Sequence, residues 1–321
     1  MLVLVLKGFR MIFRIGFSIL FCLAVSSSSA FAQVTFKFKH QPNQKTITKL
    51  LSSMSQTLVI NGNTIKSAQG TNMVMSGKTG RTAEGKVTGE IKTESMQVTV
   101  AIGDLIFLYD SKEPDEKGTT PLEYLREYYK WSMGKKVKVV YGKDFKVESV
   151  ETDTTGFEDL SEQVKQQVGD PDTAANTMKT AINQVIERFP SGPVKKGDTW
   201  KRKSDAPLGQ GQVLHFESEY KYEGVIEKDG KKLHKITSKV LSADFTIAAD
   251  STLPIKVKSA DLKPADESNG VILFDMEWGN IVEQSGLGRV TGDLVFVQGE
   301  QEIPATLDLK MESKTENSVA K

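Results

Sequence analysis

The stretch LHFESEYKYEGVIEKDG, residues 214–230, shows the pattern that decides the fold. Apolar and aromatic residues alternate there with charged and polar ones. Because successive side chains of a β-strand point to opposite faces of the sheet, this period of two predicts a strand with one buried and one solvated face. The stretch ends in Asp229-Gly230, which favours the two-residue turn of a β-hairpin because both central residues of that turn need a positive φ.

The same alternation recurs outward from this stretch, in both directions along the chain. It is clear in residues 34–38, 96–102, 272–278 and 303–311, and Asn61-Gly62 is a second hairpin turn of the same kind. Both hairpin turns are followed, some way on, by an aromatic residue and a glycine, Tyr141-Gly142 and Trp278-Gly279. This repeated order suggests two related β-rich halves.

Helical patterns interrupt the strands in three places. Residues 121–133 begin with a proline after a threonine cap and end before Gly134, as helices commonly do. Two further helices are expected in 157–169 and 171–189. We therefore expect an α+β protein of curved, mostly antiparallel sheets in two similar halves, with a helical pair between them. The expected organisation is a signal peptide at 1–32, an N-terminal half at 33–156 that contains the helix near 121–133, the helical pair at 157–190, a C-terminal half at 191–311 and a flexible tail at 312–321.

The first 32 residues have the three parts of a secretory signal peptide. A basic start is followed by an apolar run over 15–25 and by Ala30-Phe31-Ala32. The apolar run is shorter than the roughly 20 residues that a membrane-spanning helix needs. Phe21 before Cys22 argues against a lipidated cysteine, and Met11 is an alternative start to Met1. We expect cleavage after Ala32 and a periplasmic or secreted protein with no transmembrane segment.

Composition excludes several classes of function. The leader holds three of the 42 basic residues and none of the 41 acidic ones, so 39 basic and 41 acidic residues remain in the mature chain. This near-neutral charge, without a basic cluster, argues against nucleic-acid binding. Cys22 is the one cysteine of the chain, so no disulfide and no cysteine nucleophile are expected in residues 33–321.

The motifs of catalysis and metal binding are incomplete. Gly77-Lys78-Thr79 resembles the end of a phosphate-binding loop, but Asn72 stands where that loop needs its first glycine. His215 and His234 share no zinc-binding motif, although a hairpin could bring them together. Asp275 and Glu277 are the best remaining pair of acids for a hydrolase. We expect no enzyme, no cofactor and no metal.

Aromatic side chains are the other candidates for binding. The helix at 121–133 carries Tyr124, Tyr128, Tyr129 and Trp131, which form either a platform for sugars or, more simply, a core face. The residues expected to form a ligand-contacting face of the sheet are Phe216, Tyr220, Tyr222, Phe274 and Trp278.

Three segments together resemble a known family. PVKKGDTW at Pro193–Trp200, GVILFDMEWGNIVEQSG at Gly270–Gly286 and TFKFK at 35–39 are similar to the pattern of a bacterial exported family called domain of unknown function 6263. That family has no known activity, so the resemblance implies export but transfers no catalytic residue.

Two hypotheses of function remain. A curved sheet with helices across its concave side forms an apolar trough, which favours a non-enzymatic binding protein for a lipid or another amphipathic ligand. The alternative is a cell-envelope interaction or scaffold module, which would contact another exported protein through its sheet edges or helices.

Overall fold

The computed structural model describes residues 33–114, 118–168, 171–209, 211–248, 251, 253 and 255–320. The chain divides into two compact units, Met1–Val34 and Thr35–Lys321. The predicted signal peptide and its cleavage site at Ala32 lie outside the described residues. The fold below is that of the unit Thr35–Lys321.

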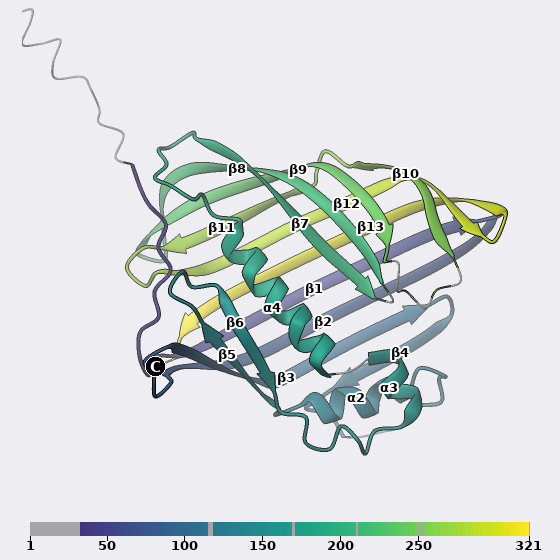
Figure 1. Ribbon diagram of the computed structural model, residues 1–321, viewed down its shortest axis with the longest axis horizontal. Helices are drawn as coiled ribbons and strands as arrows, with labels where there is room; N and C mark the ends of the chain where they lie inside the picture. Colours follow the sequence, from purple (N-terminus) through teal and green to yellow (C-terminus); the bar gives the residue numbers. More distant parts are fainter. Residues whose placement is uncertain are drawn as a thin grey trace, which may run out of the picture. The chain divides into compact units, whose positions relative to one another are not determined.

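One antiparallel sheet of 13 strands dominates this unit (Figure 1). The strands follow the order β6-β5-β3-β2-β1-β13-β12-β11-β9-β8-β7, with β4 paired to β3 and β10 paired to β12. The strands are β1 Lys45–Ile60, β2 Asn63–Arg81, β3 Val87–Ile102, β4 Leu105–Asp110, β5 Lys136–Tyr141, β6 Val147–Thr152, β7 Thr199–Gly209, β8 Gln212–Lys228, β9 Lys231–Ile247, β10 Lys256–Pro264, β11 Asn269–Asp275, β12 Asn280–Gln298 and β13 Gln301–Val319.

The two hairpin turns predicted from sequence are confirmed. Asn61 and Gly62 have φ values of 49° and 78°, and they join β1 to β2 with Ile60 opposite Asn63. Asp229 and Gly230 have φ values of 51° and 73°, and they join β8 to β9. These left-handed conformations are those that Asn-Gly and Asp-Gly adopt most readily.

The expected α+β class with two similar halves is wrong, because the N-terminal and C-terminal strands form a single sheet. β1 pairs with β13 along its length, from Thr46 opposite Val319 to Ile60 opposite Ala305. The same pairing overturns the prediction of a flexible tail at 312–321, since residues up to Val319 belong to β13. Alternation in a sequence predicts a strand and its buried face, but it does not identify the neighbouring strand.

The helical pair is also wrong as a structural unit. The helices are α2 Tyr124–Ser132, within the predicted 121–133, α3 Glu162–Val168 and α4 Pro171–Glu187. α3 packs against α2, where the Glu127 carboxylate accepts hydrogen bonds from the amide and hydroxyl of Ser161 at 2.8 and 2.7 Å. α4 packs against the edge strand β6 instead. α3 and α4 are consecutive in sequence but pack against different elements.

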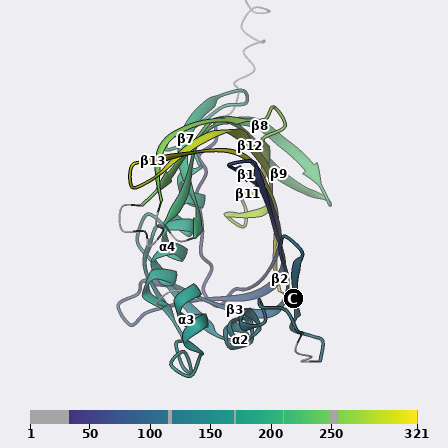
Figure 2. The same ribbon diagram turned by 90° about the vertical axis from the view of Figure 1, so that its right-hand side faces the viewer.

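α4 bridges the two edge strands of the sheet, β6 and β7. At β6, the Asn183 amide accepts a hydrogen bond from Val147 N and donates one to Val147 O, at 2.7 and 3.4 Å. At the C-terminal end of the helix, Arg202 on β7 donates to the carbonyls of Glu187 and Phe189 at 2.7 and 2.9 Å. The strands curve round to α4, which stands on the side they leave open (Figure 2). The sheet therefore encloses an interior that the helix completes.

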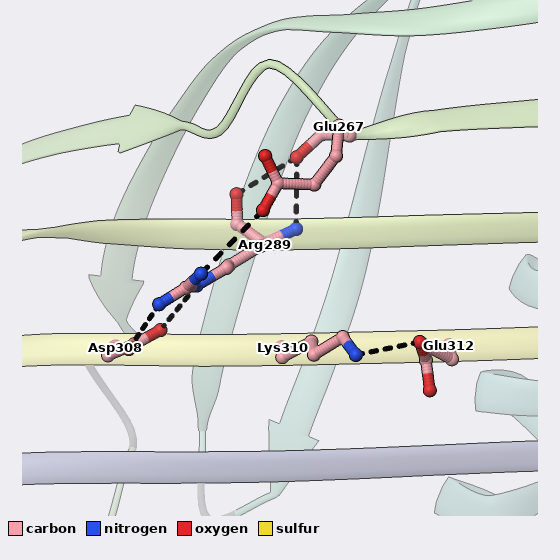
Figure 3. Close-up of polar contacts among 6 residues, drawn as sticks. Glu267, Arg289, Asp308, Lys310 and Glu312 are labelled. Atoms are coloured by element: carbon pink, nitrogen blue, oxygen red, sulfur yellow. Dashed lines mark hydrogen bonds and ion pairs between the residues drawn. The ribbon is translucent and has the colours of Figure 1, made fainter.

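The outer face of the sheet carries ion pairs. On β12 and β13, the Arg289 guanidinium binds both carboxylate oxygens of Asp308 at 3.1 and 2.9 Å, and Lys310 pairs with Glu312 at 2.8 Å (Figure 3). Glu267 Oε1 lies 3.6 Å from Arg289 Nη1, on the side of Arg289 away from Asp308. Charged side chains thus project from one face of these strands, and the apolar positions between them point inward.

Two of the apolar clusters in the interior include residues of the C-terminal strands. One is aromatic and centres on Phe274, which is fully buried; its other members are Phe36, Phe38, Phe189, Tyr222 and His234. The other lies among β8, β9, β10, β12 and β13; its buried members are Leu214, Phe245, Leu262, Val290, Leu294, Phe296, Ala305, Leu307 and Leu309.

Candidate functional site

A row of small residues crosses the inner face of the sheet. Ser52, Ser313, Gly286, Gly270 and Ser238 stand opposite one another on β1, β13, β12, β11 and β9. Residues opposite one another on antiparallel strands project to the same face, so the row forms a floor without bulky side chains. A cavity of about 550 Å³ lies over this floor. We call it the serine–glycine cavity.

The walls of the serine–glycine cavity combine apolar and polar groups. Met54, Met311 and Ile272 contribute apolar surface from three strands, and Phe216 and Tyr220 contribute aromatic surface from β8. On the opposite side, Gln184 and Arg188 come from α4 and from the residue that follows it. Their spacing of four residues places both side chains on one face of the helix.

A second cavity of about 390 Å³, the methionine cavity, lies where α2 and α4 face β2, β3 and β5. Its lining includes four methionines, Met73, Met75, Met96 and Met178. Methionine side chains are flexible and polarizable, which suits them to contacts with apolar ligands of variable shape. Aromatic side chains also line it: Tyr128, Tyr129, Trp131 and Phe157. Gln69 lines both the methionine cavity and the serine–glycine cavity, so the two adjoin.

A third cavity of about 310 Å³ adjoins the methionine cavity at Met75 and Ile91. His40, Tyr141 and Trp278 line it. The His40 ring lies 4.4 Å from the Tyr141 ring, centre to centre, and burial lowers the pKa of His40 below its usual value. The neutral imidazole is therefore favoured here.

The five predicted ligand-face aromatics fall in three places. Phe216 and Tyr220 line the serine–glycine cavity, and Trp278 lines the third cavity, where its indole N–H donates to Gln44 Oε1 at 2.8 Å. Tyr222 and Phe274 are buried in the aromatic cluster. The structure thus brings Phe216 and Tyr220 together and separates the other three from them. As ligand contacts, all five remain predictions.

Charge in the serine–glycine cavity is concentrated at Arg188. Burial raises the pKa of the Tyr220 hydroxyl, and the positive charges of Arg188 and Arg202 oppose that shift. The two acidic residues that border the cavity, Asp205 and Glu312, stand at strand positions that face outward and have partners there. Asp205 Oδ1 lies 2.7 Å from His215 Nδ1, and Glu312 pairs with Lys310.

The acids and histidines considered for catalysis have structural partners. Asp275 Oδ1 accepts hydrogen bonds from the backbone N–H groups of Glu277 and Trp278 at 2.8 and 2.9 Å, which fixes the turn before β12. His215 is in register with Asp244, whereas His234 is in register with Val225 and bonds the Tyr222 hydroxyl at 2.7 Å. The hairpin therefore does not bring the two histidines together. Gly77, Lys78 and Thr79 lie within β2 and not in a phosphate loop.

Sequence reasoning missed Arg188 and the methionines. The spacing of Met73 and Met75 was a signal, since residues two apart in a strand share a face, but their polar, glycine-rich surroundings obscured the strand. Arg188 gave no signal, because nothing in the sequence shows that α4 lies across the inner face of the sheet.

Over the residues that the structure describes, no helix is both long and apolar enough to cross a membrane, and no three acidic or histidine side chains are grouped as metal ligands.

No family model and no curated protein matches the chain. The resemblance to domain of unknown function 6263 stays a prediction. Similar solved structures include DynF from the dynemicin biosynthesis pathway of Micromonospora chersina, with 9% identity over 88% of this chain and 84% of that chain and a TM-score of 0.18. They also include an outer membrane channel from Pseudomonas putida F1, with 7% identity over 89% and 99% of the two chains and a TM-score of 0.20. A DUF1329 family protein from Desulfovibrio piger has 10% identity over 83% and 84% and a TM-score of 0.12. Likenesses at these TM-scores carry no argument about function.

Proposed function

We propose that the protein is an exported, non-enzymatic binding protein that holds a lipid or another amphipathic molecule inside the sheet. The observation that carries the proposal is the pair of adjoining cavities, about 550 and 390 Å³, on the inner face. Sites for small molecules are typically concave, mostly apolar and of this size, with a few polar groups that orient the ligand.

The arrangement of side chains supports an amphipathic ligand over a purely polar one. The methionine cavity offers thioether and aromatic surface, which matches a hydrocarbon chain. The serine–glycine cavity adds hydroxyl, amide and guanidinium groups, which match a polar head. Export rests on the leader sequence at 1–32 and places the protein in the periplasm or outside the cell.

A cavity-filling substitution tests the proposal. Gly286 lies on the floor of the serine–glycine cavity, and an added Cβ would meet no atom closer than 3.8 Å. Gly286→Leu should therefore place its side chain in the cavity without straining the backbone. We expect this variant to bind the neutral apolar dye Nile red at least about tenfold more weakly than the wild type, measured by fluorescence titration of the full chain.

Gly70→Leu is the matched control. Gly70 stands opposite Ser53 on β2, on the outer face, and a Cβ there would meet nothing within 4 Å. It should leave dye affinity unchanged. Absence of dye binding by the wild type, or equal binding by both variants, contradicts the proposal. The first of these results would favour the scaffold hypothesis, in which the protein contacts another envelope protein and holds no small molecule.

A further inference from the structure

We propose that Arg188 binds the anionic head of the ligand in the serine–glycine cavity, so that the ligand is an amphiphile with a carboxylate or phosphate head and a hydrocarbon tail. This inference rests on the proposed function, because it concerns the same cavity. It adds the charge of the ligand and the residue that recognises it.

The backbone around Arg188 is held firmly. The indole N–H of Trp200 donates to the Arg188 carbonyl at 2.7 Å, and Arg202 binds the carbonyls of Glu187 and Phe189 on either side. Arg202 also places a positive charge at the C-terminal end of α4, where it complements the helix dipole. The guanidinium of Arg188 is therefore not needed to cap the helix, and its side chain projects into the lining of the cavity.

The side chain of Arg188 differs from those of the other arginines. Its Nε is buried and has no hydrogen-bond partner, and no carboxylate within the described residues pairs with its guanidinium. The other four arginines in the same residues each hold a partner: Arg81 the Gly85 carbonyl, Arg126 the Glu123 carboxylate, Arg202 the carbonyls after α4, and Arg289 the Asp308 carboxylate.

An anionic head would supply acceptors for the guanidinium. The Nε atom has almost no accessible surface, so the ligand would bind the terminal N–H groups, whose planar fork matches two oxygens of a carboxylate or phosphate. Arg188 is the one basic residue among the described lining of this cavity. Asp205 and Glu312 border the cavity from strand positions that face outward, where they pair with His215 and Lys310, so neither competes for the guanidinium.

The groups around Arg188 fit the two ends of such a ligand. The Gln184 amide, one helical turn before Arg188, and the Tyr220 hydroxyl belong to the same lining and offer further donors for oxygen atoms. Apolar surface from Phe216, Met54 and Met311 completes it. The adjoining methionine cavity extends this apolar surface for the tail.

Two probes with the same tail separate recognition of the head from binding of the tail. Dodecanoate and dodecanol are each titrated against Nile red bound to the full chain, for the wild type, Arg188→Gln and Arg188→Lys. We expect Arg188→Gln to weaken dodecanoate at least about tenfold, as loss of a charge-assisted hydrogen bond does, and to leave dodecanol unchanged. Arg188→Lys keeps the charge and should recover most of the dodecanoate affinity.

Each other outcome has a defined meaning. If Arg188→Gln weakens the binding of dodecanoate and dodecanol equally, or weakens neither, the role of Arg188 is overturned but the binding proposal stands. Failure of the wild type to bind Nile red overturns the proposed function itself. Inorganic phosphate and acetate, which have no hydrocarbon tail, are titrated as well. Displacement of Nile red by either would show a site for free anions and overturn the proposal that the ligand is an amphiphile. A thermal unfolding curve of each variant that matches the wild type confirms that the comparison is made on folded protein.

Discussion

Individual aromatic residues of the sheet differ in role: some pack in the core and others line a cavity. Phe274 is fully buried and lies 5.3 to 5.4 Å, centre to centre, from the rings of Phe36, Phe38 and Phe189. Phe216 is half-buried and lines the serine–glycine cavity. The first should therefore matter for stability and the second for binding.

Substitution of both residues by alanine checks this division. Phe274→Ala removes a ring from a close-packed cluster and should lower the free energy of unfolding by about 3–5 kcal/mol. Phe216 packs partly against the neighbouring apolar cluster and partly borders the cavity, so Phe216→Ala should lower the free energy of unfolding by only about 1–2 kcal/mol, while weakening Nile red binding. Urea unfolding measures the first effect and dye titration the second. Similar losses of stability in the two variants would contradict the division.

His40 makes the stability of the protein depend on pH. Burial lowers the pKa of folded His40 below the ordinary 6.5, so the unfolded chain takes up a proton first as the pH falls. The contribution of the neutral His40 ring to the free energy of unfolding is fully present above about pH 6.5. It is lost as the pH falls from 6.5 toward the pKa of His40 in the folded state.

His40→Phe keeps an aromatic ring beside Tyr141 and Phe145 but removes the proton site. Its free energy of unfolding, measured by urea titration at a series of pH values, should fall less steeply below pH 6.5 than that of the wild type. Identical slopes would show that His40 contributes nothing to the acid response.

α4 is the element on which the interior depends. It bonds to β6 through Asn183 and to β7 through Arg202, and it carries Gln184 toward the serine–glycine cavity. The sequence predicted the helix and its C-terminal end before Pro190, from apolar periodicity and the proline. It did not predict the contacts of the helix, because side chains on strands far away in sequence supply them.

Loss of the Arg202 contact should loosen this element. Arg202→Ala leaves the carbonyls of Glu187 and Phe189 without their donors, and hydrogen bonds to a charged group contribute about 1.5–3 kcal/mol each. We expect the amides of α4 to exchange with solvent roughly 30-fold faster, measured by hydrogen–deuterium exchange, for a local loss of about 2 kcal/mol. Lys203→Ala, at the next and exposed position, is the control. Unchanged exchange in Arg202→Ala would show that β7 does not hold the helix.

The strand patterns and turns of the whole molecule were predictable, but the pairing that joins its two ends into one sheet was not. Alternation identified the strands around 214–222 and 272–274, and Asn61-Gly62 and Asp229-Gly230 identified two hairpins, because these signals are local. The pairing of β1 with β13 is a contact between the two ends of the chain, and local periodicity carries no information about it. The serine–glycine floor depends on that pairing, so it could not be foreseen either.

Removal of the last ten residues tests this pairing of β1 with β13. Deletion of 312–321 would be harmless to a flexible tail, but in the structure it removes strand pairs with both β1 and β12. We expect the unfolding temperature to fall by roughly 10 °C or more, measured by calorimetry on the otherwise complete chain. An unchanged unfolding temperature would contradict the central position of β13.

Native mass spectrometry of the protein purified gently from its own host shows directly whether a ligand is bound inside the sheet. We expect an added mass on the wild type that organic extraction removes, that Gly70→Leu retains and that Gly286→Leu loses. A bare wild-type protein, or the same added mass on both variants, would contradict binding inside the sheet.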